Sequence, residues 1–174
     1  MPEQNEQLWR SLIVDVPDFP EPGILFRDVT PLLESGEGLR TAVDALAGAF
    51  TGIDVVAGIE SRGFIFGAPV AYSLGIGMVP VRKPGKLPRA TASAEYSLEY
   101  GTNTLQLHRD AVSPHQRVLI VDDVLATGGT AAATVKLLEE LGAEVAGVAV
   151  LIELTALGGR AKLGTIPFVS LISY

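Results

Sequence analysis

Apolar residues along the chain form short continuous runs separated by segments with helical spacing. The runs IDVVAGIE (53–60) and VLIVDD (118–123) are rich in β-branched residues, which is typical of strands buried on both faces. Each run is followed by a predicted helix, which ends at Gly75 in the first case and at Gly142 in the second, and then by another apolar run. Two such strand–helix–strand units predict an α/β fold in which helices cover both faces of a parallel sheet.

The segments outside these two units have other patterns. Helical spacing of apolar residues predicts an amphipathic helix over 3–15 and a second helix over about 38–50. The proline-rich stretch PDFPEPG (17–23) predicts an extended, irregular connection. Residues 82–110 combine a basic loop with partial alternation of polar and apolar positions, which predicts a hairpin-like excursion above the sheet. We expect all 174 residues to form one domain.

Composition and charge narrow the classes of function. The net charge of −7 argues against general binding of nucleic acid or anionic membranes. No apolar run approaches the ~18 residues of a membrane span, and the first residues lack the pattern of a signal peptide. The chain has no cysteine, which excludes disulfides and thiolate metal sites and favours a cytoplasmic location.

One basic cluster stands out in this acidic chain. The segment RKPGKLPR (82–89) holds four of the 13 basic residues and no acidic residue. Such a cluster predicts a small anionic ligand, and the alternative is a solvated surface loop. Arg89, at its end, is expected to face the solvent.

An acidic pair and a glycine-rich turn lie where the 118–123 strand meets its helix. Glycines in ATGGT (126–130) let the backbone curl and expose its N–H groups, while the helix dipole adds positive charge. This combination suits a phosphate monoester, and the two threonines of the turn are also expected to cap the helix. Asp122 and Asp123 suit sugar hydroxyls, because ionised carboxylates only accept hydrogen bonds. Together they predict a ribose 5-phosphate site; the alternative is an ordinary strand–helix turn beside an incidental acidic pair.

These residues are also recognisable as a family motif. VLIVDDVLATGGT resembles the motif with which type I phosphoribosyltransferases bind 5-phosphoribosyl-1-diphosphate (PRPP). The stretches PGILFRDVTPLL, ESRGFIFGAPVA, VRKPGKLPR and YSLEYG, in this order, are similar to the adenine-specific members of that family. The resemblance extends from about Phe19 to the C-terminus. It implies a mostly parallel central sheet with helices on both faces, a small base-binding hood within about 1–35, and a flexible catalytic loop within about 82–110.

The same resemblance implies an activity and its partners. Members of this family form homodimers that transfer phosphoribose from PRPP to adenine, giving AMP and pyrophosphate with Mg²⁺. The phosphate turn would hold the 5′-phosphate through Ala126, Thr127, Gly128, Gly129 and Thr130. Asp122 and Asp123 would face the ribose hydroxyls, directly or through magnesium-bound water. Because Mg²⁺ keeps several waters, PRPP and water would supply most of its coordination.

Pyrophosphate and adenine have their own implied residues. For pyrophosphate these are Glu60, Ser61, Arg62, Arg82, Lys83, Lys86 and Tyr100, with a cis peptide expected at Glu60–Ser61. Arg62 and Lys86 would also be catalytic, since cations stabilise the charge that develops on the leaving group. For adenine they are Leu25, Phe26 and Arg27, with Phe26 stacked on the purine. Glu99 would transfer a proton at the base.

For several of these residues, a purely structural role remains as the alternative. Ser61 could be a helix cap, Phe26 ordinary core packing, and Glu99 a surface carboxylate. Two other functions also remain: a phosphoribosyltransferase for another purine base, and a non-catalytic regulator of the same fold that senses nucleotides.

Overall fold

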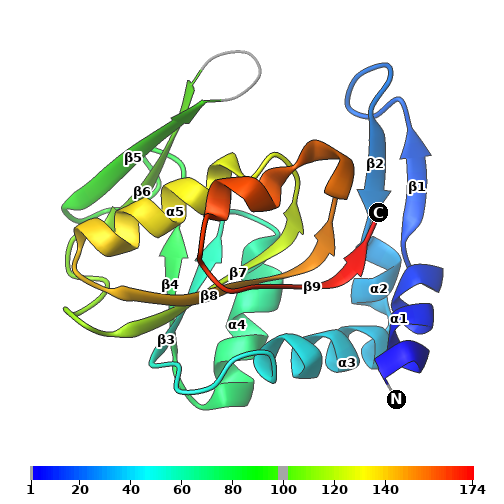
Figure 1. The fold of residues 1–174 in the computed structure, drawn as a ribbon, viewed down its shortest axis with the longest axis horizontal. Helices are drawn as coiled ribbons and strands as arrows, with labels where there is room; N and C mark the ends of the chain where they lie inside the picture. The colour runs from blue at the N-terminus through cyan, green and yellow to red at the C-terminus, as the bar shows by residue number, and fades with distance from the viewer. Residues whose placement is uncertain (1, 98–101) are drawn as a thin grey trace.

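The computed structural model describes residues 2–97 and 102–174, and its centre is a five-stranded parallel sheet with the order β4-β3-β7-β8-β9 (Figure 1). The strands of this sheet are β3 (Val55–Ile59), β4 (Gly77–Val81), β7 (Arg117–Leu125), β8 (Glu144–Glu153) and β9 (Phe168–Ser173). All four neighbouring pairs are parallel, which confirms the predicted fold class.

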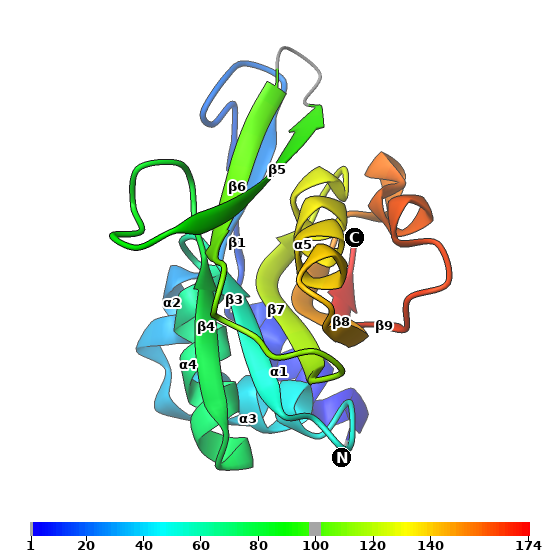
Figure 2. The ribbon, with the colours of Figure 1, turned by 90° about the vertical axis from the view of Figure 1, so that its left-hand side faces the viewer.

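Helices cover both faces of this sheet. One face carries α3 (Gly36–Ala47) and α4 (Gly63–Leu74), with α1 (Pro2–Ser11) and the short α2 (Thr30–Glu34) beside them, and α5 (Gly129–Glu140) lies on the other (Figure 2). Strand β7 shows why two cores form: Val118 and Ile120 pack towards α5, whereas Leu119 and Val121 pack towards α4. Continuous apolar runs are therefore explained by burial on both sides.

Two antiparallel hairpins project beyond the carboxyl ends of the sheet strands, one on the side of β4 and the other on the side of β9 (Figure 1). The first, β1 (Val14–Pro17) with β2 (Leu25–Asp28), follows α1. The second, β5 (Thr91–Ser97) with β6 (Thr102–His108), is the excursion predicted within 82–110. Because ligands in open α/β folds bind beyond the carboxyl ends of the strands, the hairpins flank the expected site.

The structure corrects several details of the prediction. The first helix ends at Ser11 instead of 15, because the chain turns there into β1. The expected capping by Thr127 and Thr130 is wrong: α5 has Gly128 at its N-cap position and no side-chain cap. Two 3₁₀ helices, η1 (Thr155–Leu157) and η2 (Gly159–Leu163), and the edge strand β9 were not anticipated. Within the described ranges, no helix is long and apolar enough to cross a membrane.

Candidate active site

The glycine-rich turn between β7 and α5 has the geometry of an anion site. Gly128 adopts φ +75°, a conformation that side chains disfavour, and so the turn needs glycine there. In the part of the chain that the structure describes, no protein group accepts a hydrogen bond from the N–H groups of 127–131. Residues 127–131 line a small cavity of about 70 Å³, which Asp122 also lines. The phosphate turn, residues 126–130, therefore offers unused donors at a helix N-terminus.

Asp122 and Asp123 lie in the C-terminal half of β7, against the start of α4. The backbone N–H of Asp123 donates to Oδ1 of Asp122 at 2.9 Å. A Cβ added to Gly63 would lie 2.8 Å from Oδ1 of Asp122, so only glycine lets α4 begin this close to the carboxylate. Burial, and then the neighbouring Asp123 carboxylate, raises the pKa of Asp122 well above its usual value. Such a perturbed carboxyl beside an anion site is typical of a functional position.

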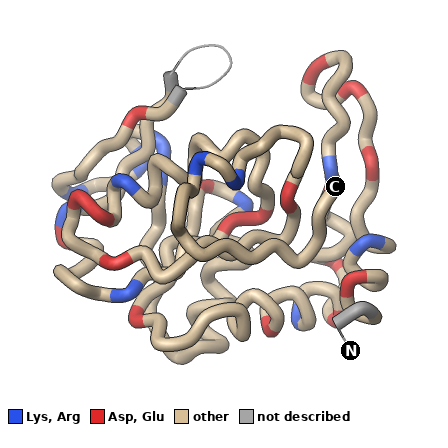
Figure 3. Tube along the Cα trace, in the orientation of Figure 1, with Lys and Arg blue, Asp and Glu red and all other residues tan. Residues whose placement is uncertain are grey.

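Arg62 links the acidic pair to the first hairpin. Its Nε lies 2.7 Å from Oδ2 of Asp123, whose side chain is only 6% exposed. The angle is not that of a hydrogen bond, so this buried oxygen has no hydrogen-bond partner among the described residues. The guanidinium also lies over the Phe26 ring, 5.1 Å from its centroid. Figure 3 shows both signs of charge side by side at the centre of the view, where these strand ends meet.

A largely apolar cavity of about 420 Å³ lies between the first hairpin and the start of α4. Its lining residues are Val16, Phe19, Phe26, Asp28, Val29, Thr30, Leu33, Arg62 and Ile65. Phe19 meets Phe26 edge to face, with ring centroids 5.1 Å apart. The backbone N–H and hydroxyl of Thr30 both donate to Asp28 and lower its pKa, so an ionised carboxylate lies at the cavity. Apolar walls with a few polar groups suit a neutral heterocyclic base.

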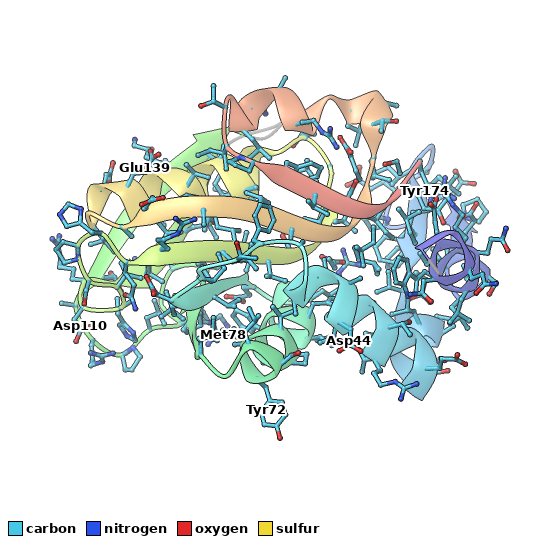
Figure 4. The ribbon with its side chains drawn as sticks, turned by 60° about the horizontal axis from the view of Figure 1, so that its bottom comes forward. Asp44, Tyr72, Met78, Asp110, Glu139 and Tyr174 are labelled. Carbon is cyan, nitrogen blue, oxygen red and sulfur yellow. The ribbon has the colours of Figure 1, made fainter. Side chains whose placement is uncertain are left out.

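The other two residues predicted to bind the base lie differently from Phe26. Leu25 is exposed and does not line the described cavity. Arg27 forms an ion pair with Asp15, and its guanidinium lies 3.9 Å from the centroid of the Tyr174 ring. Figure 4 shows Tyr174 beside the N-terminal elements, so Arg27 ties this hairpin to the end of β9. A role of Leu25 or Arg27 in base binding stays a prediction.

Glu60 anchors the basic segment that follows β4. Its Oε2 accepts hydrogen bonds from Nε of Arg82 at 3.2 Å and from the backbone N–H of Lys83 at 2.9 Å. Burial acts to raise the pKa of Glu60, but the Lys83 bond and the Arg82 charge outweigh it and hold that pKa below its usual value. The Glu60–Ser61 peptide is cis, as the family resemblance implies. Lys83 and Lys86 are exposed, so their ammonium groups can reach an anion from solvent.

The predicted residues Glu99, Tyr100 and Arg89 have different outcomes. Glu99 and Tyr100 lie outside the described residues, and their roles stay predictions. Arg89 faces the solvent, as expected, and pairs with Asp110, two residues after the end of β6. No cluster of three or more carboxylates or imidazoles that could hold a metal occurs among the described residues.

Two parts of the site are missed by reasoning from the sequence. Phe19 falls in a stretch that reads only as a proline-rich connection, and its meeting with Phe26 depends on the turn between β1 and β2. Gly159, from η2, lies against the phosphate turn: a Cβ added to it would be 2.2 Å from the carbonyl oxygen of Ala126. Its position in LGGR after β8 carries no signal of a contact with Ala126 and Gly128, which are 33 and 31 positions earlier in the sequence.

Comparison with known proteins agrees with this geometry. A model of the phosphoribosyl transferase domain matches residues 31–163. An adenine phosphoribosyltransferase from Rippkaea orientalis is 58% identical over 171 residues, covering 95% of this chain and 98% of that protein. The crystal structure of adenine phosphoribosyltransferase from Thermoanaerobacter pseudethanolicus has a TM-score of 0.95 at 51% identity, covering 97% of this chain and 99% of that one. The Saccharomyces cerevisiae enzyme, complexed with an imino-altritol bisphosphate and adenine, has a TM-score of 0.92 at 39% identity, with coverage of 97% and 99%.

Proposed function

The chain belongs to the phosphoribosyltransferase family, and from this premise we propose that it joins adenine to the phosphoribosyl group of PRPP in purine salvage. One observation carries the proposal: Arg62 contacts both Asp123, next to the phosphate turn, and Phe26, in the wall of the apolar cavity. The guanidinium of Arg62 therefore lies between a site suited to a sugar phosphate and a cavity suited to a flat neutral base.

The reaction follows from this placement. The phosphate turn receives the 5′-phosphate of PRPP on its unused amides, and the acidic pair accepts hydrogen bonds from the ribose hydroxyls. Adenine lies against Phe26, and its N9 forms a bond with C1′ of the ribose while the bond from C1′ to pyrophosphate breaks. Arg62, Arg82, Lys83 and Lys86 stabilise the negative charge that pyrophosphate carries away. Positioning the two reactants accounts for much of the expected rate enhancement.

Mg²⁺ belongs to the same proposal. The buried Oδ2 of Asp123, which lacks a hydrogen bond, and the carboxylate of Asp122 are hard oxygen acceptors of the kind that this cation prefers. These two residues fit a site completed by the oxygens of PRPP and water. The cation would neutralise phosphate charge and orient the diphosphate.

The proton released from adenine N9 needs an acceptor. Glu99, which lies outside the described residues, is proposed for it on the family resemblance. Glu99→Gln should lower kcat by about 10²- to 10⁴-fold with little change in the KM for PRPP, because a neutral amide cannot take the proton. A kcat near that of the parent protein would remove Glu99 from the mechanism.

A homodimer and a cytoplasmic location complete the proposal. The family resemblance implies the homodimer, and the absence of cysteine from the sequence supports the cytoplasmic location. Sedimentation equilibrium at several protein concentrations would measure the mass in solution, and a mass of one chain throughout would refute the dimer.

The decisive assay is formation of AMP from adenine and PRPP with Mg²⁺. Turnover with adenine is expected, because relatives that match nearly the whole chain are named adenine phosphoribosyltransferases and the cavity at Phe26 suits a neutral base. Turnover with hypoxanthine but not adenine would favour a phosphoribosyltransferase for another base. Binding of AMP without turnover of any base would favour a nucleotide-sensing regulator.

A further inference from the structure

The phosphate turn is in backbone contact with a segment far from it in sequence. A Cβ added to Gly128 would lie 2.3 Å from the carbonyl oxygen of Gly159. In the other direction, a Cβ on Gly159 would lie 2.2 Å from the oxygen of Ala126 and 2.8 Å from the nitrogen of Gly128. Gly159 does not have a positive φ, so glycine is required there by the close approach alone. The start of η2 thus backs the turn without any side chain between them.

The residue after Gly159 is held firmly at the end of the sheet. Arg160 donates from Nε and Nη2 to the two carboxylate oxygens of Glu153, at 3.1 and 2.7 Å. Glu153 ends β8, its side chain is only 8% exposed, and it also accepts a bond from the hydroxyl of Ser170 on β9. The Arg160 guanidinium lies 4.5 Å from the centroid of the Phe168 ring. The Arg160 side chain is 59% exposed, but its two hydrogen bonds to a buried carboxylate give the pair a defined geometry.

We propose that the Glu153–Arg160 ion pair positions the phosphate turn, acting through the backbone of Gly159. This inference rests on the proposed function of the turn as the 5′-phosphate site. The pair holds the start of η2 at a fixed place, and Gly159 then limits where the backbone from Ala126 to Gly128 can lie. Arg160 and Glu153 are positioning residues, because neither belongs to the lining of the cavity at the turn.

The first test compares two variants in which a glycine gains one methyl group. Gly159→Ala forces the turn to move, whereas Gly36→Ala adds the same group at the start of α3, where nothing lies within 4 Å. Isothermal titration calorimetry with AMP should give a Kd about 10- to 100-fold higher for Gly159→Ala and unchanged for Gly36→Ala. Steady-state kinetics should show the KM for PRPP rising while the KM for adenine stays unchanged. Equal AMP affinity in both variants would overturn the proposal.

The second test removes the ion pair and keeps both glycines. Arg160→Met should raise the KM for PRPP, and Arg160→Lys, which keeps the charge but not the two-bond geometry, should restore part of the affinity. The control is Arg117→Met at the start of β7, which breaks a looser pair of 3.7 Å with Glu144 at the start of β8. If Gly159→Ala does not fold, the comparison of Arg160→Met with Arg117→Met tests the proposal by itself.

A readout without substrate separates this inference from the proposed function. Hydrogen exchange of the Ala132 amide, which donates to the carbonyl oxygen of Gly128 at 3.0 Å, should be faster in Arg160→Met than in Arg117→Met in the ligand-free protein. If the parent protein fails to bind AMP, the proposed function fails. If the parent binds AMP, and Arg160→Met matches Arg117→Met in both affinity and exchange, the proposed function stands and only the positioning role is refuted.

Discussion

Replacing Arg62 by Met is the perturbation that probes both halves of the site at once. Methionine keeps an apolar stem of similar length and removes the guanidinium, and so the contacts with Asp123 and Phe26 are lost together. Asp123 is then left as a buried carboxylate with no counter-charge at 2.7 Å. If Arg62 bridges the sugar-phosphate and base subsites, binding of both substrates must weaken.

The expected size follows from the geometry. Two unit charges 2.7 Å apart attract by roughly 6 kcal/mol in an effective dielectric of about 20. The side chain of Arg62 is 39% exposed, so solvent screening and the cost of desolvation reduce this to about 2 kcal/mol. If the whole of this energy serves to hold Arg62 and Asp123 in place for PRPP, its loss raises the KM for PRPP by up to roughly 30-fold. The contact with the Phe26 ring is worth about 1 kcal/mol, or roughly fivefold in the KM for adenine.

Steady-state kinetics with each substrate varied in turn would measure both effects. Arg89→Met is the matched control, because that arginine is 59% exposed and contacts Asp110 and His108, neither of which lines the two cavities of the site. The control should keep both KM values. If Arg62→Met raised the KM for PRPP alone, or left both constants unchanged, the bridging role of Arg62 would be refuted.

Other residues of the site lead to narrower predictions. Phe26→Ala should raise the KM for adenine by about 10- to 100-fold and leave the KM for PRPP unchanged in the same kinetic assay, because only the base stacks on this ring. Glu60→Gln should lower kcat by about tenfold with an unchanged KM for adenine, since Arg82 and the backbone of Lys83 lose their charged acceptor; a kcat equal to that of the parent would show that this anchor is dispensable. Asp122→Asn should increase stability by about 1 kcal/mol at neutral pH while weakening PRPP binding. Because the folded protein raises the pKa of Asp122, its carboxyl costs stability as pH rises above the unfolded value of 3.8 and through the raised pKa. Urea unfolding should therefore show a larger gain at about pH 8 than at about pH 5, and a gain that does not grow with pH would contradict this.

How far the sequence predicts this molecule depends on the distance over which each contact acts. The parallel sheet and the helices α3, α4 and α5 follow from local periodicity, and Gly75 ends α4 with φ +68° as its position predicts. Gly128 also fits a locally readable motif, since a strand, small residues and a helix follow one another within a few positions. Predictions of this kind need no knowledge of the rest of the chain.

Contacts between segments that are distant in the sequence cannot be predicted from local patterns. The Arg62–Asp123 pair joins residues from two strand–helix units, and neither residue type reveals its partner. Arg27 shows the converse: its neighbour Phe26 lines the cavity, but alternate residues of a strand point to opposite faces, and Arg27 instead meets Asp15 and Tyr174. The family resemblance names residues but does not say which of them touch.

The most direct test of the account is a crystal structure of the protein with bound AMP. The account predicts the phosphate on the backbone amides of the turn at 127–130, the ribose hydroxyls at Asp122 and Asp123, and the purine against Phe26. A nucleotide bound elsewhere, with the phosphate turn empty, would contradict it.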